Sequence, residues 1–342
     1  AVHVRCSEHR TVIEQAGLQV ISHNISRSGL NPFRELVSVL QLVKVLRSFR
    51  PDVIHLIALK PIVLGSLASI FYPKAKIVNA PVGMGYLFAS NDVRARLARP
   101  LVKLVLKSTL GRKRSMTIIE NSDDKTSLVE GGFLHSNQIV LIRGTGVNLD
   151  VFRPTTEPDG PKIVVLIARM LRDKGVFEFV ESARIIKRTH PTTLFWLIGD
   201  ADPGNPASLT TQQLQAWNDE GIVEWLGYRT DVADLLTKIH VVCLPSYREG
   251  FGKVFVEAGA ALRAVVATDV PGCREAVEHQ INGLLVEPKN SEALAAALVE
   301  VLDNDLLRLR LAKEGRRRAE FEFSSETVNA QTLAVYQQVL GQ

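Results

Sequence analysis

Short apolar runs rich in β-branched residues alternate with amphipathic stretches along the whole chain. Near-continuous apolar runs are typical of parallel strands that are covered by helices on both faces. The strand predictions are residues 19–23, 52–59, 76–82, 116–120, 139–144, 162–170, 192–200, 222–228, 240–246, 264–270 and 283–288, and the opening run AVHVRC also reads as a strand. The alternation predicts an α/β fold with doubly wound sheets.

The pattern is interrupted at DVFRPTTEPDGPK, residues 150–162, where prolines and polar residues precede a new strand. A chain of 342 residues also exceeds what one hydrophobic core usually serves. We therefore predict an N-terminal domain over 1–153 and a C-terminal domain over 154–325. A last helix over 326–342 has an apolar face, which we expect to pack back toward the N-terminal domain.

Charge is distributed unevenly between the two predicted domains. Residues 1–150 contain 20 Lys and Arg against 10 Asp and Glu, whereas the remainder contains 21 against 26. This asymmetry indicates two units with different partners.

The three cysteines, Cys6, Cys243 and Cys273, are odd in number and unpaired in spacing. This pattern argues against both a disulfide framework and a zinc site, and we infer a reducing cytoplasm. No apolar segment reaches the ~20 residues of a membrane span. The chain opens without an initiator Met in what reads as a strand under way, so we expect further residues upstream.

Two basic residues follow the predicted strand 162–170. Arg169 and Lys174 stand between a strand and a helix, with Asp173 as the predicted N-cap. Arg offers a bidentate fork and Lys a point charge, and an anion is favoured again at a helix N-terminus, so this edge suits a diphosphate. The alternative is a solvated basic turn.

Two glutamates flank the start of another helix, in REGFGKVFVEAGAALRA. Glu249 lies in a loop whose Gly250 and Gly252 permit close backbone approach to a ligand. Glu257 lies about one turn into the helix, from which its carboxylate could accept hydrogen bonds from a ribose diol. The alternative for a lone glutamate here is a capping or dipole role.

Other acidic and basic residues have alternative interpretations. Asp200 and Asp202 could form a metal pair, but acidic residues beside Pro and Gly are ordinary loop chemistry, and we expect no metal. We expect His55 to be a core histidine. Lys60, at the end of its strand, could meet an acceptor phosphate.

Taken together, these motifs resemble retaining glycosyltransferases of family 4. YREGFGKVFVEAGA is similar to that family's Glu-x7-Glu motif, and ARMLRDKG, IGDADPGNP, WLGYRTDV and VPGCREAVEHQINGLLVEP stand in its order and spacing. SRSGLNPFREL, RPDVIHLIALKP and NAPVGMGYLF resemble the subgroup that adds hexoses or N-acetylhexosamines to polyprenyl-diphosphate sugars or other surface glycans. The resemblance covers essentially the whole chain.

The resemblance implies a GT-B fold, in which two Rossmann-like domains face a cleft and the C-terminal one binds the nucleotide sugar, here a UDP-sugar. Arg169 and Lys174 would bind the diphosphate, Glu257 the ribose and Glu249 the transferred sugar. The remaining donor-binding residues would be Gly250, Phe251, Gly252, Lys253 and Val254, with Gly227, Tyr228 and Arg229 at the base. The implied mechanism is retention without a protein nucleophile, the acceptor hydroxyl attacking on the face from which UDP leaves.

Two departures from the family concern the acceptor side. Where many relatives have a histidine, this chain has APVGMGY, as in the polyprenyl-linked subgroup, so Gly83 and Gly85 are the acceptor-side predictions beside Lys60. The family's first strand and its glycine loop are also absent from the sequence, which predicts that part of the acceptor side is missing.

Residues 94–114 predict a membrane-docking helix. The window has eight Lys and Arg and no acidic residue, and Arg96, Arg99, Lys103 and Lys107 recur at helical spacing. Several cations near an anionic leaflet could hold the domain at the inner face of the cytoplasmic membrane. The alternative is a solvated surface helix. We expect no nucleic-acid partner.

Three other function classes remain as alternatives. A dinucleotide-dependent oxidoreductase is disfavoured, because no G-x-G-x-x-G follows a predicted strand. A non-catalytic nucleotide-binding scaffold of the same fold and a transferase with a small soluble acceptor stay open. The sequence does not define the donor sugar, the acceptor or the linkage.

Overall fold

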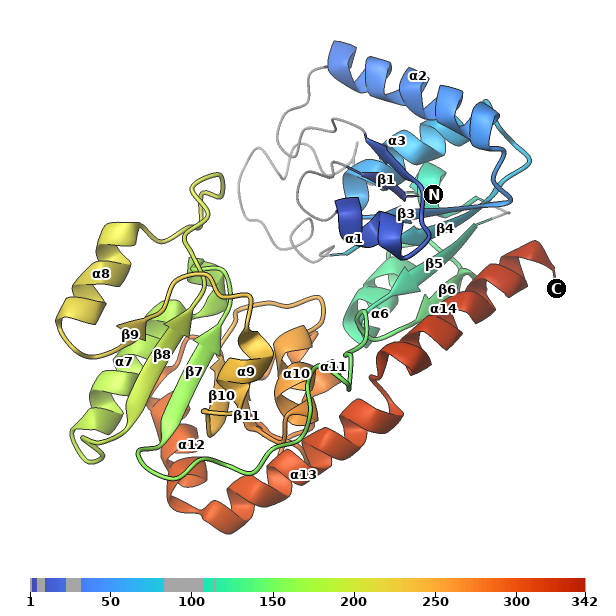
Figure 1. Cartoon of the computed structure of the whole chain (residues 1–342). Coiled ribbons are helices and arrows are strands. Elements are labelled where there is room, and N and C mark those ends of the chain that lie inside the picture. The colour runs from blue at the N-terminus through green and yellow to red at the C-terminus, as the bar shows by residue number, and fades with distance from the viewer. Residues whose placement is uncertain (1, 5–9, 23–31, 83–106, 113–114, 342) are drawn as a thin grey trace.

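The computed structural model describes residues 2–4, 10–22, 32–82, 107–112 and 115–341, which form two lobes (Figure 1). The N-terminal lobe contains a two-stranded and a four-stranded parallel sheet. Its elements are β1 (Val2–Val4), α1 (Arg10–Gln15), β2 (Val20–Ser22), α2 (Pro32–Phe49), β3 (Val53–Ile57), α3 (Leu59–Ser69), β4 (Lys76–Ala80), β5 (Ser115–Ile119), α6 (Ser122–Glu130), η1 (Ser136–Gln138) and β6 (Ile139–Leu141).

The C-terminal lobe is built on a six-stranded parallel sheet of order β12-β11-β10-β7-β8-β9. Its elements are β7 (Ile163–Ile167), η2 (Arg172–Lys174), α7 (Val176–Lys187), β8 (Leu194–Ile198), α8 (Thr211–Asp219), β9 (Glu224–Trp225), α9 (Val232–Leu236), β10 (Val241–Leu244), α10 (Lys253–Ala260), β11 (Ala264–Thr268), α11 (Cys273–Ala276), β12 (Leu284–Val286), α12 (Ser291–Asp303) and α13 (Asp305–Phe321). The last helix, α14 (Ser325–Leu340), follows α13.

The hydrophobic pattern accounts for this architecture. Each of the eleven predicted strand ranges contains a strand, and the opening run contains β1. Every residue of β10 and β11 is buried, as expected for central strands covered by helices on both faces. The predicted α/β fold with two doubly wound, Rossmann-like units is confirmed.

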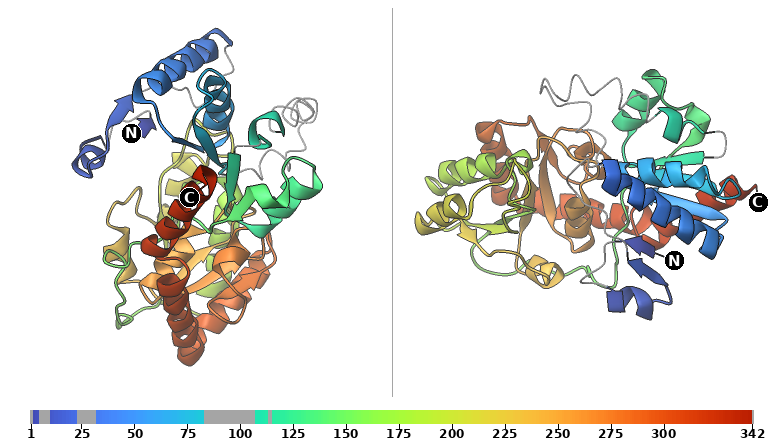
Figure 2. Two further views of the ribbon diagram at one scale, coloured as in Figure 1. Left: turned by 90° about the vertical axis from the view of Figure 1, so that its right-hand side faces the viewer. Right: turned by 90° about the horizontal axis from the view of Figure 1, so that it is seen from above.

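The C-terminal helix α14 leaves the C-terminal lobe and packs on the four-stranded sheet of the N-terminal lobe (Figures 1 and 2). Val328 and Val335 are buried against Val78 of β4 and Met116 of β5. Just before α14, Ser324 forms a parallel bridge with Val147, which lies on the other chain segment that passes between the lobes. The two passages therefore lie side by side.

Two buried arginines attach the segment 150–162 to the C-terminal lobe. Arg263 donates to the carbonyl of Thr155 at 2.8 Å and to its hydroxyl at 2.6 Å. Arg308, 1% exposed, forms a two-point ion pair with Glu157 through bonds of 2.8 and 2.9 Å. The segment that joins the lobes thus has fixed polar contacts on the C-terminal side.

Among the described residues, no helix combines the length and the hydropathy that crossing a membrane requires.

We predict that Arg308→Met destabilises the C-terminal lobe, because it leaves the carboxylate of Glu157 without its buried partner. Breaking such a pair costs about 3 kcal/mol, which in a unit of this size lowers the thermal midpoint by roughly 6–12 °C. Differential scanning calorimetry measures the change. Arg317→Met, on the same helix but paired with Glu314 at the exposed surface, is the control and should leave the thermal midpoint essentially unchanged. Equal midpoints for the two variants would contradict the anchoring role.

Candidate active site

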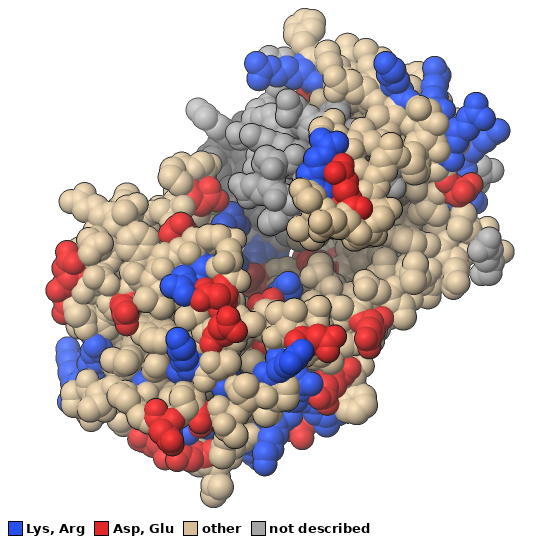
Figure 3. All heavy atoms as spheres, in the orientation of Figure 1, with Lys and Arg blue, Asp and Glu red and all other residues tan. Residues whose placement is uncertain are grey.

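The predicted donor-binding residues gather at one edge of the six-stranded sheet. Arg169 follows β7, Asp200 follows β8, Glu249 follows β10 and Gly272 follows β11. Because all these strands are parallel, their carboxyl ends meet at the same edge, where α/β proteins place their ligands. This edge borders the hollow between the two lobes, whose rim carries both basic and acidic side chains (Figure 3).

Lys174 and Glu249 form an ion pair at this edge. Lys174 Nζ lies 2.5 Å from Glu249 Oε1, and the same oxygen accepts a hydrogen bond from Ser246 Oγ at 2.7 Å. The side chains are only 21% and 11% exposed. An ammonium group and a carboxylate, 75 positions apart in sequence, are therefore held together in a partly dehydrated place where electrostatic interactions are strengthened.

A glycine turn brings this pair together. Gly175 has φ 71° and ψ 28°, and a Cβ at this position would lie 2.0 Å from the carbonyl oxygen of Pro245. Gly175 is also the N-cap of α7, so the prediction that Asp173 fills that role was wrong. Asp173 lies one turn earlier, in η2, where its carbonyl accepts the N–H of Tyr247. The left-handed turn needs no side-chain cap, and it lets the two backbones touch.

Arg169 lies at the outer rim of the edge. Its side chain is 60% exposed, and Nη1 lies 2.9 Å from Asp202 Oδ2. Asp200 Oδ1 instead accepts the backbone N–H of Tyr228 at 3.1 Å. The two aspartates that sequence alone could assign to a metal thus have separate partners, and the described part of the chain holds no group of three or more potential metal-ligating side chains.

The turn predicted to meet the base follows β9. Gly227 accepts the N–H of Gly199 through its carbonyl at 2.8 Å, and Tyr228 as a residue is 71% exposed. Arg229 binds Asp231 through two bonds of 2.8 and 2.5 Å, which lower the pKa of that carboxyl to about 2. The guanidinium of Arg229 is therefore engaged within its own turn, whereas Tyr228 offers an exposed ring.

The Gly250–Gly252 loop is shaped by a second close backbone approach. Gly272, at φ 75°, would place a Cβ 2.5 Å from the carbonyl oxygen of Glu249 and 2.7 Å from that of Gly250. Its own carbonyl accepts the N–H of Gly252 at 3.3 Å. The loop after β10 thus rests on the turn after β11, and it leads directly into α10.

Glu257 lies in the second turn of α10. Lys253 Nζ is 3.2 Å from Glu257 Oε1, and the glutamate side chain is 15% exposed. Burial raises the pKa of Glu257, and the ammonium group of Lys253 opposes that effect. Val254, on the same helix, packs against the core of the C-terminal lobe.

Phe251 links the loop to the N-terminal side. Its ring lies so close to Gly144 that a Cβ on that glycine would come within 2.4 Å of ring carbon Cδ1. The ring also packs against Phe323 with a centroid distance of 5.5 Å. The side chain of Phe251 is therefore a partly buried packing group between the loop, Gly144 and Phe323.

A segment of the N-terminal lobe that was not predicted from the sequence also contacts this site. Asn121 donates to the carbonyl of Gly250 at 3.0 Å, and Glu275 Oε1 accepts from both the N–H and the hydroxyl of Ser122 at 2.6 Å. Glu120 is half-buried, and its pKa is raised by burial and then by the negative charges of Asp124 and Glu249. The signal was present in the sequence, because ENSDD ends the predicted strand 116–120 as the other site loops end theirs.

The acceptor-side predictions are distributed differently. Lys60, in the first turn of α3, forms an ion pair with Glu35 of α2 at 2.6 Å. Gly83 and Gly85 lie outside the described residues. His55 is hydrogen-bonded through Nδ1 to the Tyr336 hydroxyl of α14 at 2.7 Å, and burial lowers its pKa.

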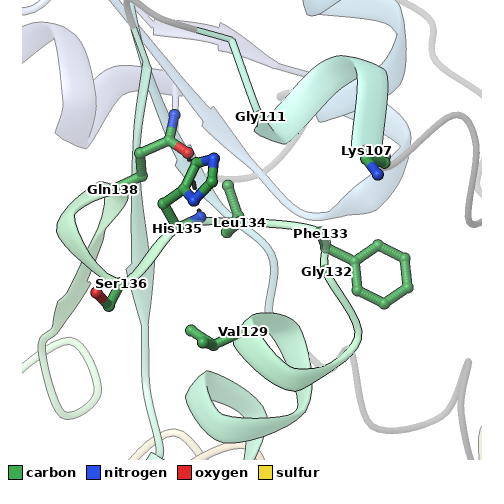
Figure 4. Close-up of a pocket in the computed structure, with 9 residues that line it drawn as sticks. All are labelled: Lys107, Gly111, Val129, Gly132, Phe133, Leu134, His135, Ser136 and Gln138. Carbon is green, nitrogen blue, oxygen red and sulfur yellow. Dashed lines mark hydrogen bonds between the residues drawn. The ribbon is translucent and has the colours of Figure 1, made fainter.

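A pocket of about 410 Å³ lies at the C-terminal end of α6 (Figure 4). Val129, Phe133 and His135 are among its lining residues, and Gln138 accepts the N–H of His135 at 3.2 Å. None of the predicted site residues lines it. The opposite end of α6 is the one that meets the C-terminal lobe, so this pocket is separate from the candidate active site.

Comparison with protein families places both parts of the chain. Residues 149–318 match the model of glycosyl transferases group 1, and residues 1–114 match the glycosyl transferase 4-like model. Among solved structures, that of Anabaena Alr3699/HepE in complex with UDP-glucose has a TM-score of 0.79 at 20% identity, covering 99% of this chain and 91% of that one. A glycosyltransferase from Rickettsia africae has a TM-score of 0.77, with coverage of 99% and 89%.

Curated relatives are similar over most of their length. One, from Campylobacter jejuni, is an N,N'-diacetylbacillosaminyl-diphospho-undecaprenol alpha-1,3-N-acetylgalactosaminyltransferase, 30% identical over 97% of this chain and 89% of its own. Another, from Escherichia coli, is a UDP-Gal:alpha-D-GlcNAc-diphosphoundecaprenol alpha-1,3-galactosyltransferase, 23% identical over 82% and 74%. The chain belongs to the group 1 glycosyltransferases and has their GT-B fold.

Proposed function

We propose that this protein transfers a hexose or N-acetylhexosamine from a UDP-sugar to a surface-glycan acceptor linked to a polyprenyl diphosphate, with retention at the anomeric carbon. The activities of the Campylobacter and Escherichia relatives support the acceptor class. The observation that carries the donor half is the pairing of Lys174 with Glu249 at the carboxyl edge of the C-terminal sheet.

The cations of this edge suit a leaving diphosphate. Lys174 is held by Glu249 near the N-terminus of α7, where the helix dipole also favours an anion. Arg169 has an exposed guanidinium whose fork can bind phosphate oxygens at two points. As the sugar–phosphate bond breaks, negative charge grows on UDP, and preorganised cations lower the energy of that state. Because Lys174 and Arg169 can stabilise the negative charge of the leaving diphosphate, we infer that the reaction needs no metal ion.

The two glutamates suit two different groups of the donor. Glu249 lies in the loop after β10, directly before the Gly250–Gly252 backbone, and would accept hydrogen bonds from hydroxyls of the transferred sugar. Glu257 lies farther along α10 and would accept from the ribose diol. The exposed ring of Tyr228 would then stack on the base.

For the acceptor, we propose that the N-terminal lobe associates with an anionic membrane surface. Most of the basic window 94–114 lies outside the described residues, but Lys107 is described and exposed. The described helix α2 adds an amphipathic surface. Its exposed face carries, at helical spacing, the apolar side chains of Phe33, Leu36, Val37 and Leu40, each more than half exposed, followed by Lys44 and Arg47. Lys and Arg side chains gather at the outer edge of this lobe (Figure 3).

Turnover tests the function directly. We expect radiolabelled UDP-hexose or UDP-N-acetylhexosamine, offered with a polyprenyl-diphosphate-linked sugar, to label the lipid fraction, with and without EDTA. Binding of UDP without transfer to any acceptor would favour the non-catalytic scaffold, and labelling of a water-soluble sugar alone would favour a soluble acceptor. In the same assay, Lys174→Ala should lower kcat by about 10²–10³, as removal of one preorganised charge-stabilising donor does elsewhere.

Arg169 provides a second test in that assay, in which its replacement by alanine is compared with its replacement by lysine. Arg169→Ala should also lower kcat, and Arg169→Lys should restore only part of it, because an ammonium group cannot reproduce a two-point contact. Full activity of Arg169→Lys would contradict bidentate binding of the diphosphate.

We predict a division of labour between the glutamates. Glu257→Gln should weaken UDP binding by about tenfold, as loss of a charged hydrogen bond implies, while Glu249→Gln should leave UDP affinity near that of the parent and lower kcat. Isothermal titration with UDP and steady-state kinetics separate the two effects. Equal losses of UDP affinity in both variants would show that the assignment is wrong.

Membrane association should depend on the basic window. The quadruple change Arg96→Glu, Arg99→Glu, Lys103→Glu and Lys107→Glu should reduce sedimentation with anionic vesicles by at least about a hundredfold in affinity, since each cation contributes about 1 kcal/mol. Binding by the parent should weaken as salt rises. A control variant with the same net charge, carrying Glu in place of the exposed Arg188, Lys238, Arg310 and Lys313 of the C-terminal lobe, should bind like the parent. Similar losses in both variants would leave no role for the window.

A further inference from the structure

Asn121, at the carboxyl end of β5, contacts the sugar-binding loop from the N-terminal lobe. Its side chain is buried, with 1% of the residue exposed. Its Nδ2 group donates to the Gly250 carbonyl at 3.0 Å and to Asp124 Oδ2 at 2.9 Å. Gly250 directly follows Glu249, so this bond lies one peptide unit from the carboxylate that we assign to the transferred sugar.

The two ends of the Asn121 amide have separate tasks. Oδ1 accepts the N–H of Asp124 at 2.7 Å and so caps α6, a local role that aspartate or serine fills as well as asparagine. Nδ2 donates across to Gly250 of the other lobe and also to Asp124 in the first turn of α6, and neither aspartate nor serine offers an N–H donor to these two groups. Both substitutions keep the cap at the Asp124 N–H and remove the crossing bond together with the side-chain bond to Asp124, and serine does so without placing a second carboxylate beside Asp124.

Gly250 is held on two sides. Within the C-terminal lobe, Gly272 lies so close to the carbonyl oxygens of Glu249 and Gly250 that a Cβ would not fit between them. From the N-terminal lobe, Asn121 donates to the carbonyl of Gly250. The turn that contains Gly272 continues into α11, whose Glu275 accepts from Ser122, the residue after Asn121. One patch of the C-terminal lobe thus meets the start of α6 at two places.

Glu275 connects the two lobes beside the Asn121 bond through several hydrogen bonds. Besides the two bonds from Ser122, it accepts from Arg143 Nε at 2.5 Å, and its side chain is only 7% exposed. Burial alone would raise the pKa of Glu275, but the bonds from Arg143 and Ser122 outweigh burial and lower it. The carboxylate is therefore fixed in its charged form at the N-terminus of α6, which favours negative charge.

We propose that Asn121 is a positioning residue for sugar transfer, whose side-chain N–H holds the Gly250 carbonyl and thereby the sugar-binding loop when the N-terminal lobe is docked. The inference rests on the proposed function, because it takes Glu249 as the sugar contact. It implies that the donor-sugar site takes its final shape only when the acceptor-binding lobe docks. Nucleotide binding, which uses Glu257 and residues elsewhere on the C-terminal lobe, does not need the bond.

The experiment compares Asn121→Asp and Asn121→Ser with Asn304→Asp. Asn304 caps α13 through the same kind of bond, from Leu307 N–H to its Oδ1 at 2.9 Å, and no hydrogen bond from its side chain to the sugar-binding loop is present. Both Asn121 variants should lower kcat at saturating donor by about tenfold to a hundredfold, as a misplaced reacting group does, with UDP affinity within about twofold of the parent. Asn304→Asp should match the parent in both.

A second measurement does not depend on turnover. Hydrogen exchange should become faster in peptides covering Gly250 to Phe255 in both Asn121 variants, while peptides of α6 keep their protection because the cap remains. If the parent transferred no sugar, the proposed function would fail, and this exchange comparison would still decide whether Asn121 positions the loop. Unchanged exchange in that loop, parental kcat in both variants, or equal kcat losses in Asn304→Asp would overturn the proposal.

Discussion

The contact on which the active-site geometry depends is a backbone one, between Gly175 and the carbonyl of Pro245. A Cβ at Gly175 would lie 2.0 Å from that oxygen, so only glycine lets the loop after β7 pass this close to the end of β10. Lys174 directly precedes Gly175, and Ser246 directly follows Pro245. The close contact therefore brings both side chains to the same oxygen, Oε1 of Glu249. A side chain at position 175 would push the two loops apart, and Lys174 would no longer reach Glu249.

The charges of the site follow a common arrangement, in which each cation is matched by a nearby carboxylate. Lys174 pairs with Glu249, Arg169 with Asp202 and Lys253 with Glu257. A partly buried ammonium group without such a partner would be costly. The carboxylates therefore orient the cations, and in the proposed reaction the donor diphosphate would compete with these carboxylates for them. This competition favours ligands that bring more negative charge than one carboxylate, as a diphosphate does.

The sequence predicted the strands of the sheets well, but it did not predict the contacts between loops that lie far apart in the chain. Apolar runs predicted each strand found among the described residues. Arg169, Lys174 and Glu249 were singled out because they follow strand ends, and the carboxyl edge of a parallel sheet is a local consequence of strand direction. The cap of α7 was wrongly predicted at Asp173, since the αL turn at Gly175 is set by the passing backbone of Pro245, which no local pattern encodes. Asn121 escaped for the same reason: its partner Gly250 is 129 positions away and belongs to the other lobe.

The path of the chain determines what those cross-lobe contacts can do. The two segments that pass between the lobes lie together at the bridge of Val147 with Ser324, where Val147 N–H donates to Phe323 and Ser325 N–H donates to Val147. The two crossing segments are therefore bonded to each other at this one place. Phe251, packed on Gly144 and Phe323, lies close to it, whereas the bond from Asn121 to Gly250 joins the lobes through side chain and loop alone. Separation of the lobes would break this bond together with the contacts of Glu275 with Ser122 and Arg143, so under our proposal the arrangement of the sugar-binding loop depends on whether the two lobes are docked.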